Sequence, residues 1–516
     1  MELESRVMKT HSCTRLRAAL ALACLAGPGI AFSQAAHDCA GLTSLKLADT
    51  RIVSAETVSG PAFTPPGAKA ALADLPGFCR VSAVIKPKIQ IEVWLPLEGW
   101  NGKYQGTGNG GYSGAIVYTE LADGVRRHYA TANTDMGHEN TAPDPASWAL
   151  GHPELIIDQG YRAQHEMALK AKQIVTTFYG SAPRLSYFIG CSSGGWQGLT
   201  EAQRFPKDYD GIIAGAPAME VIHLHAGTLW VNLAAQKIAE PKFRLITDAV
   251  MAKCDAADGV KDGLLSDPRT CNFQPEELAC KAGQSSASCL TPDEVGALQD
   301  IYSGLHNAAH EPIYPGWPRG LEYALVQTRA PFVAALVTST FKDMVFEDPN
   351  WDYHTINYDR DVRRADAKLG ATLNNDSPDL RNFRRAGGKL ILWHGWDDPL
   401  ISALHTVGYY RKVAAFLAGP KANRETATTA VQDFTRLFMA PGVNHCGGGP
   451  GPNTFDTLSA LETWVEHGQA PERIIASHST KGVIDRTRPL CPYPQVAAYN
   501  GSGSTDDAAN FSCRTP

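Results

Sequence analysis

A serine lies inside a pattern that is typical of nucleophiles in hydrolases. The segment GCSSGG (190–195) contains the form G-x-S-x-G, in which a tight turn between a strand and a helix exposes the serine, here Ser192. The preceding LSYFIG (185–190) reads as a strand, and the following WQGLTEAQRF (196–205) reads as a helix. The motif alone is common by chance, so this context is what favours Ser192 as the group that attacks an acyl carbonyl.

A candidate acid and a candidate base follow later in the chain, in the order that α/β-hydrolases use. Asp397 and Asp398 come directly after the strand-like run KLILWHG (389–395), and the residues themselves barely separate the two. His445 follows a second such run, RLFMAPG (436–442), in a glycine-rich loop. A histidine there would take the proton from the serine, and a carboxylate would orient the imidazole. Turn formation by Asp-Asp-Pro and a plain surface histidine are the alternatives.

Cysteines flank both the serine and the histidine. Of the 12 cysteines, ten remain once Cys13 and Cys24 of the N-terminal segment are set aside, and an even number in an exported chain indicates disulfides. Spacing favours four local pairs, Cys39–Cys79, Cys254–Cys271, Cys280–Cys289 and Cys491–Cys513, which leaves Cys191 and Cys446. If these two were bonded, their alpha carbons would lie within about 4.4–6.8 Å, and Ser192 would lie beside His445. Zinc is the competing use of cysteines, but the chain contains no C-x-x-C pair.

The segment GTGNGG (106–111) has two interpretations. It matches the dinucleotide fingerprint G-x-G-x-x-G, but YSGAIVYTEL (112–121) is not a clear helix, and a disulfide-bonded exported chain suits a nicotinamide cofactor poorly. We therefore expect no organic cofactor. The favoured use is an oxyanion hole, in which backbone N–H groups of Gly110, Gly111 and Ser193 stabilise a developing negative oxygen.

Aspartates concentrate in the loop CDAADGVKDGL (254–264). Calcium prefers oxygen ligands, and three aspartates together with loop carbonyls would supply them, although the spacing is not that of an EF-hand. Asp-Gly pairs also form plain turns. The residues by themselves leave metal binding and turn formation equally open.

Strands and helices alternate around these motifs, which favours a mostly parallel sheet covered by helices on both faces. Further strands are expected at IQIEVWLP (89–96), KYQGTG (103–108), HYATANTD (128–135) and GIIAGAP (211–217), and helices over 158–180 and near 402–417. In the middle of the chain this alternation is lost, which we interpret as a large lid inserted after the strand that ends near Pro217. The Gly/Ser-rich tail from Tyr499 is expected to be a loop.

The N-terminus has the features of a signal peptide, with positive residues before a short apolar run (18–26) and small residues after it. That run is too short to cross a bilayer, which needs ~20 residues. We divide the chain into a signal peptide (1–35), the first part of an α/β-hydrolase domain (36–218), a lid domain with the aspartate loop (219–385) and the second part of the hydrolase domain (386–516). The net charge of −6 is spread evenly, which excludes a polybasic nucleic-acid surface. We expect a secreted or periplasmic protein with no membrane or nucleic-acid partner.

Together the motifs resemble the tannase and feruloyl esterase family of α/β-hydrolases over essentially the whole mature sequence. The resemblance rests on Cys191-Ser192, HGWDDPLI (394–401), His445-Cys446, GNGG (108–111) and CDAADGVKDG (254–263). It implies a disulfide between Cys191 and Cys446, and it selects Asp398 over Asp397 because the family's acid is followed by one residue and then Leu-Ile. It also implies a structural calcium in the lid, held by the side chains of Asp255, Asp258 and Asp262 and by the carbonyls of Val260 and Leu264.

The same resemblance implies a serine esterase that cleaves small aromatic esters through an acyl-enzyme. The acyl group would be feruloyl, another hydroxycinnamoyl, or galloyl, and the ester could be attached to a plant polysaccharide or polyphenol. A terephthalate monoester or another aryl ester is the alternative within the family, and a non-catalytic binding module with the hydrolase fold is the alternative outside it. The aromatic-rich lid segment from Phe332 to Trp351 is the candidate wall of the acyl pocket.

Overall fold

The computed structural model describes residues 38–139 and 143–516. The predicted signal peptide (1–35) lies outside these residues. No helix among them has both the length and the apolar character needed to cross a membrane.

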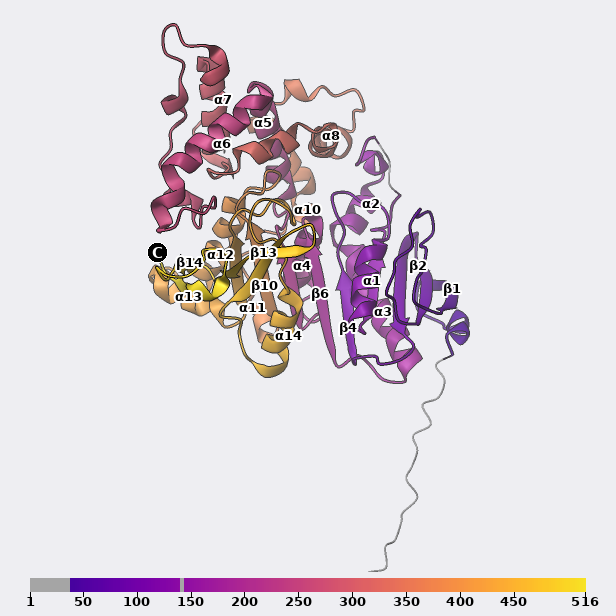
Figure 1. Cartoon of the computed structure of the whole chain (residues 1–516). Helices are drawn as coiled ribbons and strands as arrows, with labels where there is room; N and C mark the ends of the chain where they lie inside the picture. The colour runs from indigo at the N-terminus through magenta and orange to yellow at the C-terminus, as the bar shows by residue number, and fades with distance from the viewer. Residues whose placement is uncertain (1–37, 140–142) are drawn as a thin grey trace, which may run out of the picture. The chain divides into compact units, whose positions relative to one another are not determined.

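A nine-stranded sheet forms the centre of the described chain, in the order β1-β2-β3-β5-β4-β6-β7-β10-β11 (Figure 1). Neighbouring strands are parallel from β5 through β11, whereas β1, β2 and β3 add an antiparallel edge. The strands span Thr50–Val58 (β1), Phe78–Ile85 (β2), Ile89–Pro96 (β3), Lys103–Thr107 (β4), Ala130–Thr134 (β5), Leu185–Cys191 (β6), Gly211–Gly215 (β7), Lys389–Gly395 (β10) and Thr435–Ala440 (β11). This is the mostly parallel sheet that the sequence predicts.

Two strands of the sheet, β1 and β2, were not expected. In β1 only Ile52 and Ala55 are buried, so its pattern of apolar residues is too weak to indicate a strand. The strand forms because it pairs along its length with β2, with Thr50 opposite Ile85 and Val58 opposite Phe78.

Helices cover both faces of the sheet. In β10, Leu390 and Leu392 belong to a buried cluster that includes residues of α3, α4 and α12, whereas Ile391 belongs to a cluster that includes residues of α14. This alternation follows from the two-residue period of a strand. The helix α1 covers the antiparallel edge on the α14 side, where Val125 packs near Trp94. These helices span Tyr118–Arg126 (α1), Ala163–Tyr179 (α3), Ser193–Arg204 (α4), Ala403–Ala418 (α12) and Thr457–His467 (α14).

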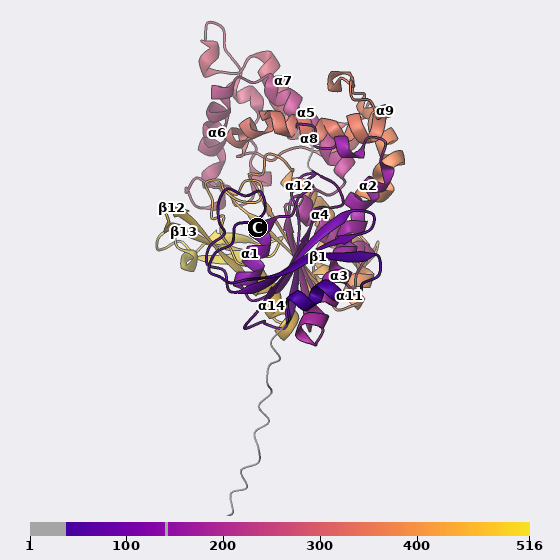
Figure 2. The same ribbon diagram turned by 90° about the vertical axis from the view of Figure 1, so that its right-hand side faces the viewer.

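The chain leaves the sheet after β7 and returns with β10, its neighbour in the sheet, and the residues between form the lid. Its longer helices span Val221–Gln236 (α5), Glu240–Cys254 (α6), Pro292–Ser303 (α7), Pro331–Ser339 (α8) and Tyr358–Ala365 (α9). Lid residues such as Phe243, Ile301 and Trp317 belong to a second buried cluster, which also includes Tyr112 and Trp196 of the hydrolase part. Figures 1 and 2 show these helices (pink to orange) gathered at one end of the sheet. The boundaries at 219 and 385 stay a prediction.

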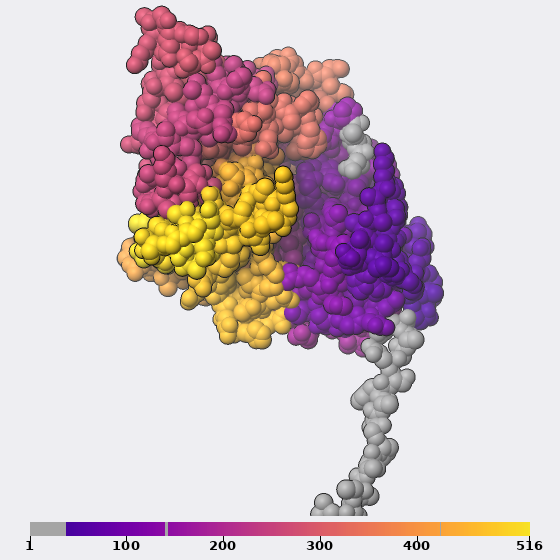
Figure 3. Space-filling view, in the orientation of Figure 1, coloured from indigo at the N-terminus to yellow at the C-terminus, as the bar shows by residue number. Residues whose placement is uncertain are grey.

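Two pairs of strands follow α14. They span Ile474–Thr480 (β12), Val483–Leu490 (β13), Val496–Tyr499 (β14) and Phe511–Arg514 (β15). The expectation of a loop from Tyr499 onward is therefore wrong for the last residues, because β15 pairs with β14 and Cys513 is bonded to Cys491. The C-terminal strands (yellow in Figure 3) lie next to the lid, and Arg488 of β13 donates a hydrogen bond to Asp262 of the lid at 2.6 Å.

Candidate active site

Ser192 lies on a sharp turn between β6 and α4. Its φ of 64° and ψ of −123° are unusual for a residue with a side chain, and such strain is typical of a nucleophile elbow. Glycines allow the turn: a Cβ on Gly190 would lie 2.4 Å from backbone atoms of Gly194. The Ser192 amide donates to the carbonyl of Gly215 at 3.0 Å, which ties the turn to β7.

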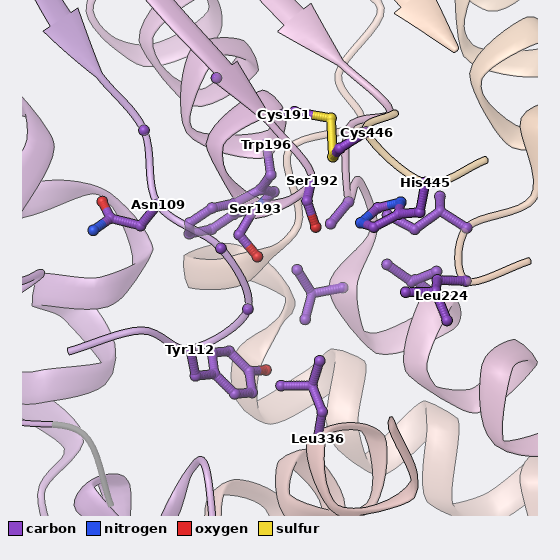
Figure 4. A pocket seen from close by; sticks show the side chains of 18 of the residues that line it. Asn109, Tyr112, Cys191, Ser192, Ser193, Trp196, Leu224, Leu336, His445 and Cys446 are labelled. Carbon is purple, nitrogen blue, oxygen red and sulfur yellow. A yellow bond between two sulfur atoms is a disulfide. The ribbon is translucent and has the colours of Figure 1, made fainter. Parts of the chain in front are cut away.

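A disulfide joins the residue next to Ser192 to the residue next to His445. The five disulfides of the described chain are the pairs indicated by the sequence: Cys39–Cys79, Cys191–Cys446, Cys254–Cys271, Cys280–Cys289 and Cys491–Cys513. Cys191 and Cys446 are 255 residues apart in the chain, and their alpha carbons lie 5.9 Å apart. In Figure 4 the Ser192 hydroxyl points toward the ring of His445, with this disulfide beside them.

The imidazole of His445 is held by Asp398. Its Nδ1 lies 2.7 Å from Oδ2 of Asp398, so Nδ1–H donates to the carboxylate and Nε2 is left for proton exchange. Burial by itself lowers the pKa of His445, but the charge and the hydrogen bond of Asp398 outweigh burial and raise this pKa above its ordinary value. The imidazolium that forms when His445 accepts a proton is therefore stabilised.

Asp398 is fully buried and remains charged because its neighbours satisfy it. Its Oδ1 accepts the backbone N–H groups of Leu400 and Ile401 at 2.8 and 3.0 Å, and His394 Nε2 lies 3.0 Å from Oδ2. Burial raises the pKa of a carboxyl group, but His445 and His394 together hold the pKa of Asp398 well below its usual range. The sequence does not single out His394, and its contact with the acid was not predicted.

Asp397, the other candidate acid, makes different contacts. Its backbone amide donates to the carbonyl of Val443 at 3.0 Å, and no hydrogen bond joins it to His445 in the described chain. Burial and the nearby charge of Glu322 raise the pKa of Asp397. Asp398 is therefore the carboxylate that the fold brings to the histidine.

Three residues with free backbone N–H groups line the same cavity as Ser192. The N–H groups of Gly110, Gly111 and Ser193 belong to residues that line it, and no acceptor within residues 38–139 and 143–516 takes their hydrogens. Such free donors can stabilise a developing oxyanion. Helix α1 begins only at Tyr118, so no helix opens directly after GTGNGG (106–111), as a dinucleotide fingerprint would require.

Two amide side chains that the sequence did not single out hold this loop. The backbone N–H of Asn109 donates to Gln197 Oε1 at 2.9 Å, and Asn109 Nδ2 donates to the carbonyl of Thr134, also at 2.9 Å. These bonds connect the loop to α4 and to β5. They fix the position of Gly110 and Gly111 relative to the serine.

A cavity of about 810 Å³ opens above Ser192, between the sheet and the lid. Of the lid segment predicted to form the acyl pocket, Phe332 and Leu336 in α8 line the cavity, whereas Phe341 is buried in the lid core. Helix α5 contributes Leu224 and His225, which sequence reasoning missed because α5 is apolar nearly all round. Figure 4 shows Leu224 and Leu336 facing the serine and histidine side.

The predicted calcium ligands share one tight loop. Asp255 is buried, and its Oδ1 accepts the N–H groups of Asp262 and Gly263 at 3.2 and 3.1 Å. Burial, followed by the charges of Asp262 and Asp258, raises the pKa of Asp255. Three carboxylates close enough to repel one another are a donor set that fits Ca²⁺. Asp262 also has a cationic partner, because its Oδ2 pairs with Arg488.

A second acidic cluster lies away from the cavity. Ligand atoms of His165, Glu201 and Asp208 lie within 4.8 Å of one another. The ammonium of Lys172 donates a hydrogen bond to the backbone carbonyl of Asp208 and interacts electrostatically with the side chains of Asp208 and Glu201. Because His165 Nδ1 already pairs with Asp208 Oδ2 at 2.6 Å and Lys172 places an ammonium group beside the cluster, we assign no metal to it.

Comparison with known proteins identifies the family. The family model described as tannase and feruloyl esterase matches residues 75–514. This chain belongs to the tannase and feruloyl esterase family. It is therefore a carboxylic ester hydrolase of that type, and the predicted α/β-hydrolase fold with an inserted lid is confirmed.

Relatives of this family cover nearly the whole chain. An uncharacterized esterase of Xanthomonas campestris is 39% identical, over 96% of this chain and 95% of its own length. The mono(2-hydroxyethyl) terephthalate hydrolase of Piscinibacter sakaiensis is 33% identical, over 87% of each chain. The crystal structure of feruloyl esterase B from Aspergillus oryzae superposes with a TM-score of 0.85 at 27% identity, covering 92% of this chain and 99% of that one.

Proposed function

We propose that this protein is an exported serine esterase that cleaves aromatic carboxylic esters through an acyl-enzyme. Ser192 is the nucleophile, His445 the general base and acid, and Asp398 the orienting carboxylate. The observation that carries the proposal is the linkage of Asp398 to His445 at 2.7 Å and of Cys446 to Cys191 by a disulfide, which brings three separate loops to one cavity.

In the first half-reaction, Oγ of Ser192 attacks the carbonyl carbon of the ester while Nε2 of His445 takes the hydroxyl proton. The carbonyl oxygen becomes an oxyanion, and the N–H groups of Gly110, Gly111 and Ser193 are the donors that would receive it. The carbon–oxygen bond to the alcohol then breaks, and His445 gives its proton to the departing alkoxide. The acyl group remains bonded to Ser192.

In the second half-reaction, water replaces the alcohol. His445 takes a proton from the water, whose oxygen attacks the acyl carbon, and the ester bond to Ser192 breaks. The proton returns to Oγ, and the carboxylic acid leaves. Asp398 stays ionised throughout because its buried carboxylate is fully hydrogen-bonded.

The proposed acyl group is aromatic, of the hydroxycinnamoyl or galloyl type. The cavity supports this choice because its walls are mainly apolar. They include two aromatic side chains, Phe332 from the lid and Trp393 from the sheet. Family membership supports it as well, since feruloyl esterases are among the relatives. A terephthalate monoester is the second candidate, favoured by the hydrolase of Piscinibacter sakaiensis.

Three further properties belong to the proposal. The lid residues 219–385 would set substrate specificity, and a Ca²⁺ bound by Asp255, Asp258 and Asp262 with the carbonyls of Val260 and Leu264 would rigidify the lid. The ester could be part of a plant polysaccharide or polyphenol. The protein would act in the periplasm or outside the cell, where its disulfides are stable.

Hydrolysis of methyl ferulate, methyl gallate and monomethyl terephthalate by the purified protein tests the proposal. We expect turnover of at least one aromatic ester and its loss in Ser192→Ala. The matched control is Ser181→Ala, which removes an exposed hydroxyl in a surface turn and should keep full activity. Turnover in Ser192→Ala equal to that of the control would refute the mechanism.

A further inference from the structure

Among residues 38–139 and 143–516, one ionisable side chain of the cavity has no hydrogen-bond or ion-pair partner. Among the described residues that line the cavity, Tyr112 and His225 both hydrogen-bond to Thr340, at 2.8 and 2.6 Å, and His445 is held by the acid. No hydrogen bond or ion pair connects the Glu120 carboxylate to any described residue. Lysine and arginine are absent from the described lining. The described walls therefore offer a substrate a free carboxylate and no lysine or arginine to oppose it.

The position of Glu120 makes this carboxylate costly to leave unpaired. It lies in the first turn of α1, whose Leu121 and Val125 are buried against the sheet, and its own side chain is only partly exposed. Burial, and then the charge of Asp123, raises the pKa of Glu120. The helix N-terminus favours an acidic residue in the first turn. It does not supply the hydrogen-bond donor that a partly desolvated carboxylate requires.

We propose that Glu120 is a specificity-determining residue whose carboxylate accepts a hydrogen bond from a hydroxyl group of the substrate. The same carboxylate repels substrates that carry an ionised carboxylate of their own. This inference rests on the proposed esterase function. Phenolic hydroxyls on the aromatic ring and hydroxyls of the alcohol portion have the same donor chemistry. Either would satisfy Glu120, and the experiment below separates them.

The same geometry predicts weak activity on a terephthalate monoester. Its free carboxylate would enter an apolar cavity that already contains Glu120 and in which the described walls provide no lysine or arginine. Two like charges several ångströms apart in a partly desolvated site repel strongly. We expect the penalty to reach about 10- to 100-fold in kcat/KM relative to an uncharged ester of the same shape.

The test uses three pairs of esters, each differing in one property. Methyl 4-hydroxycinnamate and methyl cinnamate differ in a ring hydroxyl. The 2-hydroxyethyl and propyl esters of cinnamic acid differ in an alcohol hydroxyl. Dimethyl and monomethyl terephthalate differ in one negative charge. For each pair, the ratio of kcat/KM values is measured in the wild type and in three variants.

The variants separate charge from hydrogen bonding. Glu120→Gln keeps an acceptor but removes the charge, and Glu120→Leu removes both. Asp123→Asn is the matched control, because Asp123 lies on the same helix but is exposed and pairs with Arg126. The wild type should prefer the hydroxyl-bearing member of the first or the second pair by about tenfold, since a hydrogen bond to a charged acceptor has this worth. Glu120→Leu should abolish that preference, and Asp123→Asn should leave it unchanged.

For the terephthalate pair, Glu120→Gln should raise the relative rate on the monoester by about tenfold or more, while Asp123→Asn has no such effect. Equal rates of the wild type on the monoester and the diester would overturn the inference. So would ratios that do not change in either Glu120 variant, the result expected if Glu120 serves only the helix N-terminus. Failure of the proposed function is distinct from these outcomes, because the wild type would then hydrolyse none of the six esters.

Discussion

Cys191 and Cys446 are bonded to each other although 255 residues separate them, and the next residue after Cys191 and the residue before Cys446 are Ser192 and His445. The crosslink thus connects the two loops that carry the reacting groups. Removal of this crosslink should lower activity by more than the loss of fold stability alone would explain.

We predict that the double variant Cys191→Ser/Cys446→Ser loses most esterase activity while remaining folded at low temperature. Removing one disulfide destabilises a protein by about 2–5 kcal/mol, and here the loops of Ser192 and His445 also lose their common restraint. Circular dichroism and kcat on an aromatic ester measure the two effects separately. The matched control is Cys280→Ser/Cys289→Ser, which opens a short loop in the lid, and it should keep most activity. Similar losses in both double variants would contradict a special role of the Cys191–Cys446 bond.

Asp398→Asn should lower kcat by about three to four orders of magnitude without unfolding the protein. The amide cannot stabilise the imidazolium of His445, and it favours the wrong tautomer. Asp397→Asn is the adjacent control, because Asp397 does not hydrogen-bond to the histidine in the described chain, and its kcat should change far less. A larger loss in Asp397→Asn than in Asp398→Asn would show that Asp398 is not the acid.

Activity should fall as the pH falls through the pKa of His445, because only the neutral imidazole can accept the serine proton. Asp398 raises this pKa above its ordinary value, so the acidic limb of kcat/KM should lie above about pH 6.5. The negative charge of Asp398 favours the protonated form of His445, so a higher pH is needed to deprotonate the imidazole. In Asp398→Asn, the residual activity should show its acidic limb at lower pH. An unshifted limb in that variant would contradict the electrostatic coupling.

Chelation of calcium should lower the melting temperature of the protein by several degrees. A ligand at one hundred times its Kd stabilises the folded state by about 3 kcal/mol, and this is lost when EDTA removes it. Added Ca²⁺ should restore the melting temperature of the wild type, but not that of Asp255→Asn/Asp258→Asn. The same melting temperature in EDTA and in Ca²⁺ would show that the loop of residues 254–264 is held by its own hydrogen bonds and by Arg488.

The site could be predicted from the sequence where chemistry and local structure coincide. Ser192, Asp398 and His445 each follow a recognisable buried strand, and parallel strands bring their carboxyl ends to one edge of a sheet. The flanking cysteines added a long-range restraint, because their bond connects the loops of Ser192 and His445. For these residues, the local sequence pattern therefore also predicts the position in the fold.

Other parts depend on packing that a local pattern does not report. Helix α5 is apolar on most sides, so nothing in its sequence marks Leu224 and His225 as the residues that face the cavity. The strand β1 exists through its pairing with β2 rather than through its own periodicity. Glu120 has no motif at all, and only the absence of a partner in the described chain draws attention to it.

Mapping of a covalent adduct tests the central claim most directly. The protein is treated with a serine-directed aryl phosphonate, digested without reduction, and analysed by mass spectrometry. We predict one phosphonyl group per chain, on Ser192, in a crosslinked pair of peptides that also contains His445 through the Cys191–Cys446 bond. An active enzyme labelled on another serine, or a Ser192 peptide that is not crosslinked to the His445 peptide, would contradict the account.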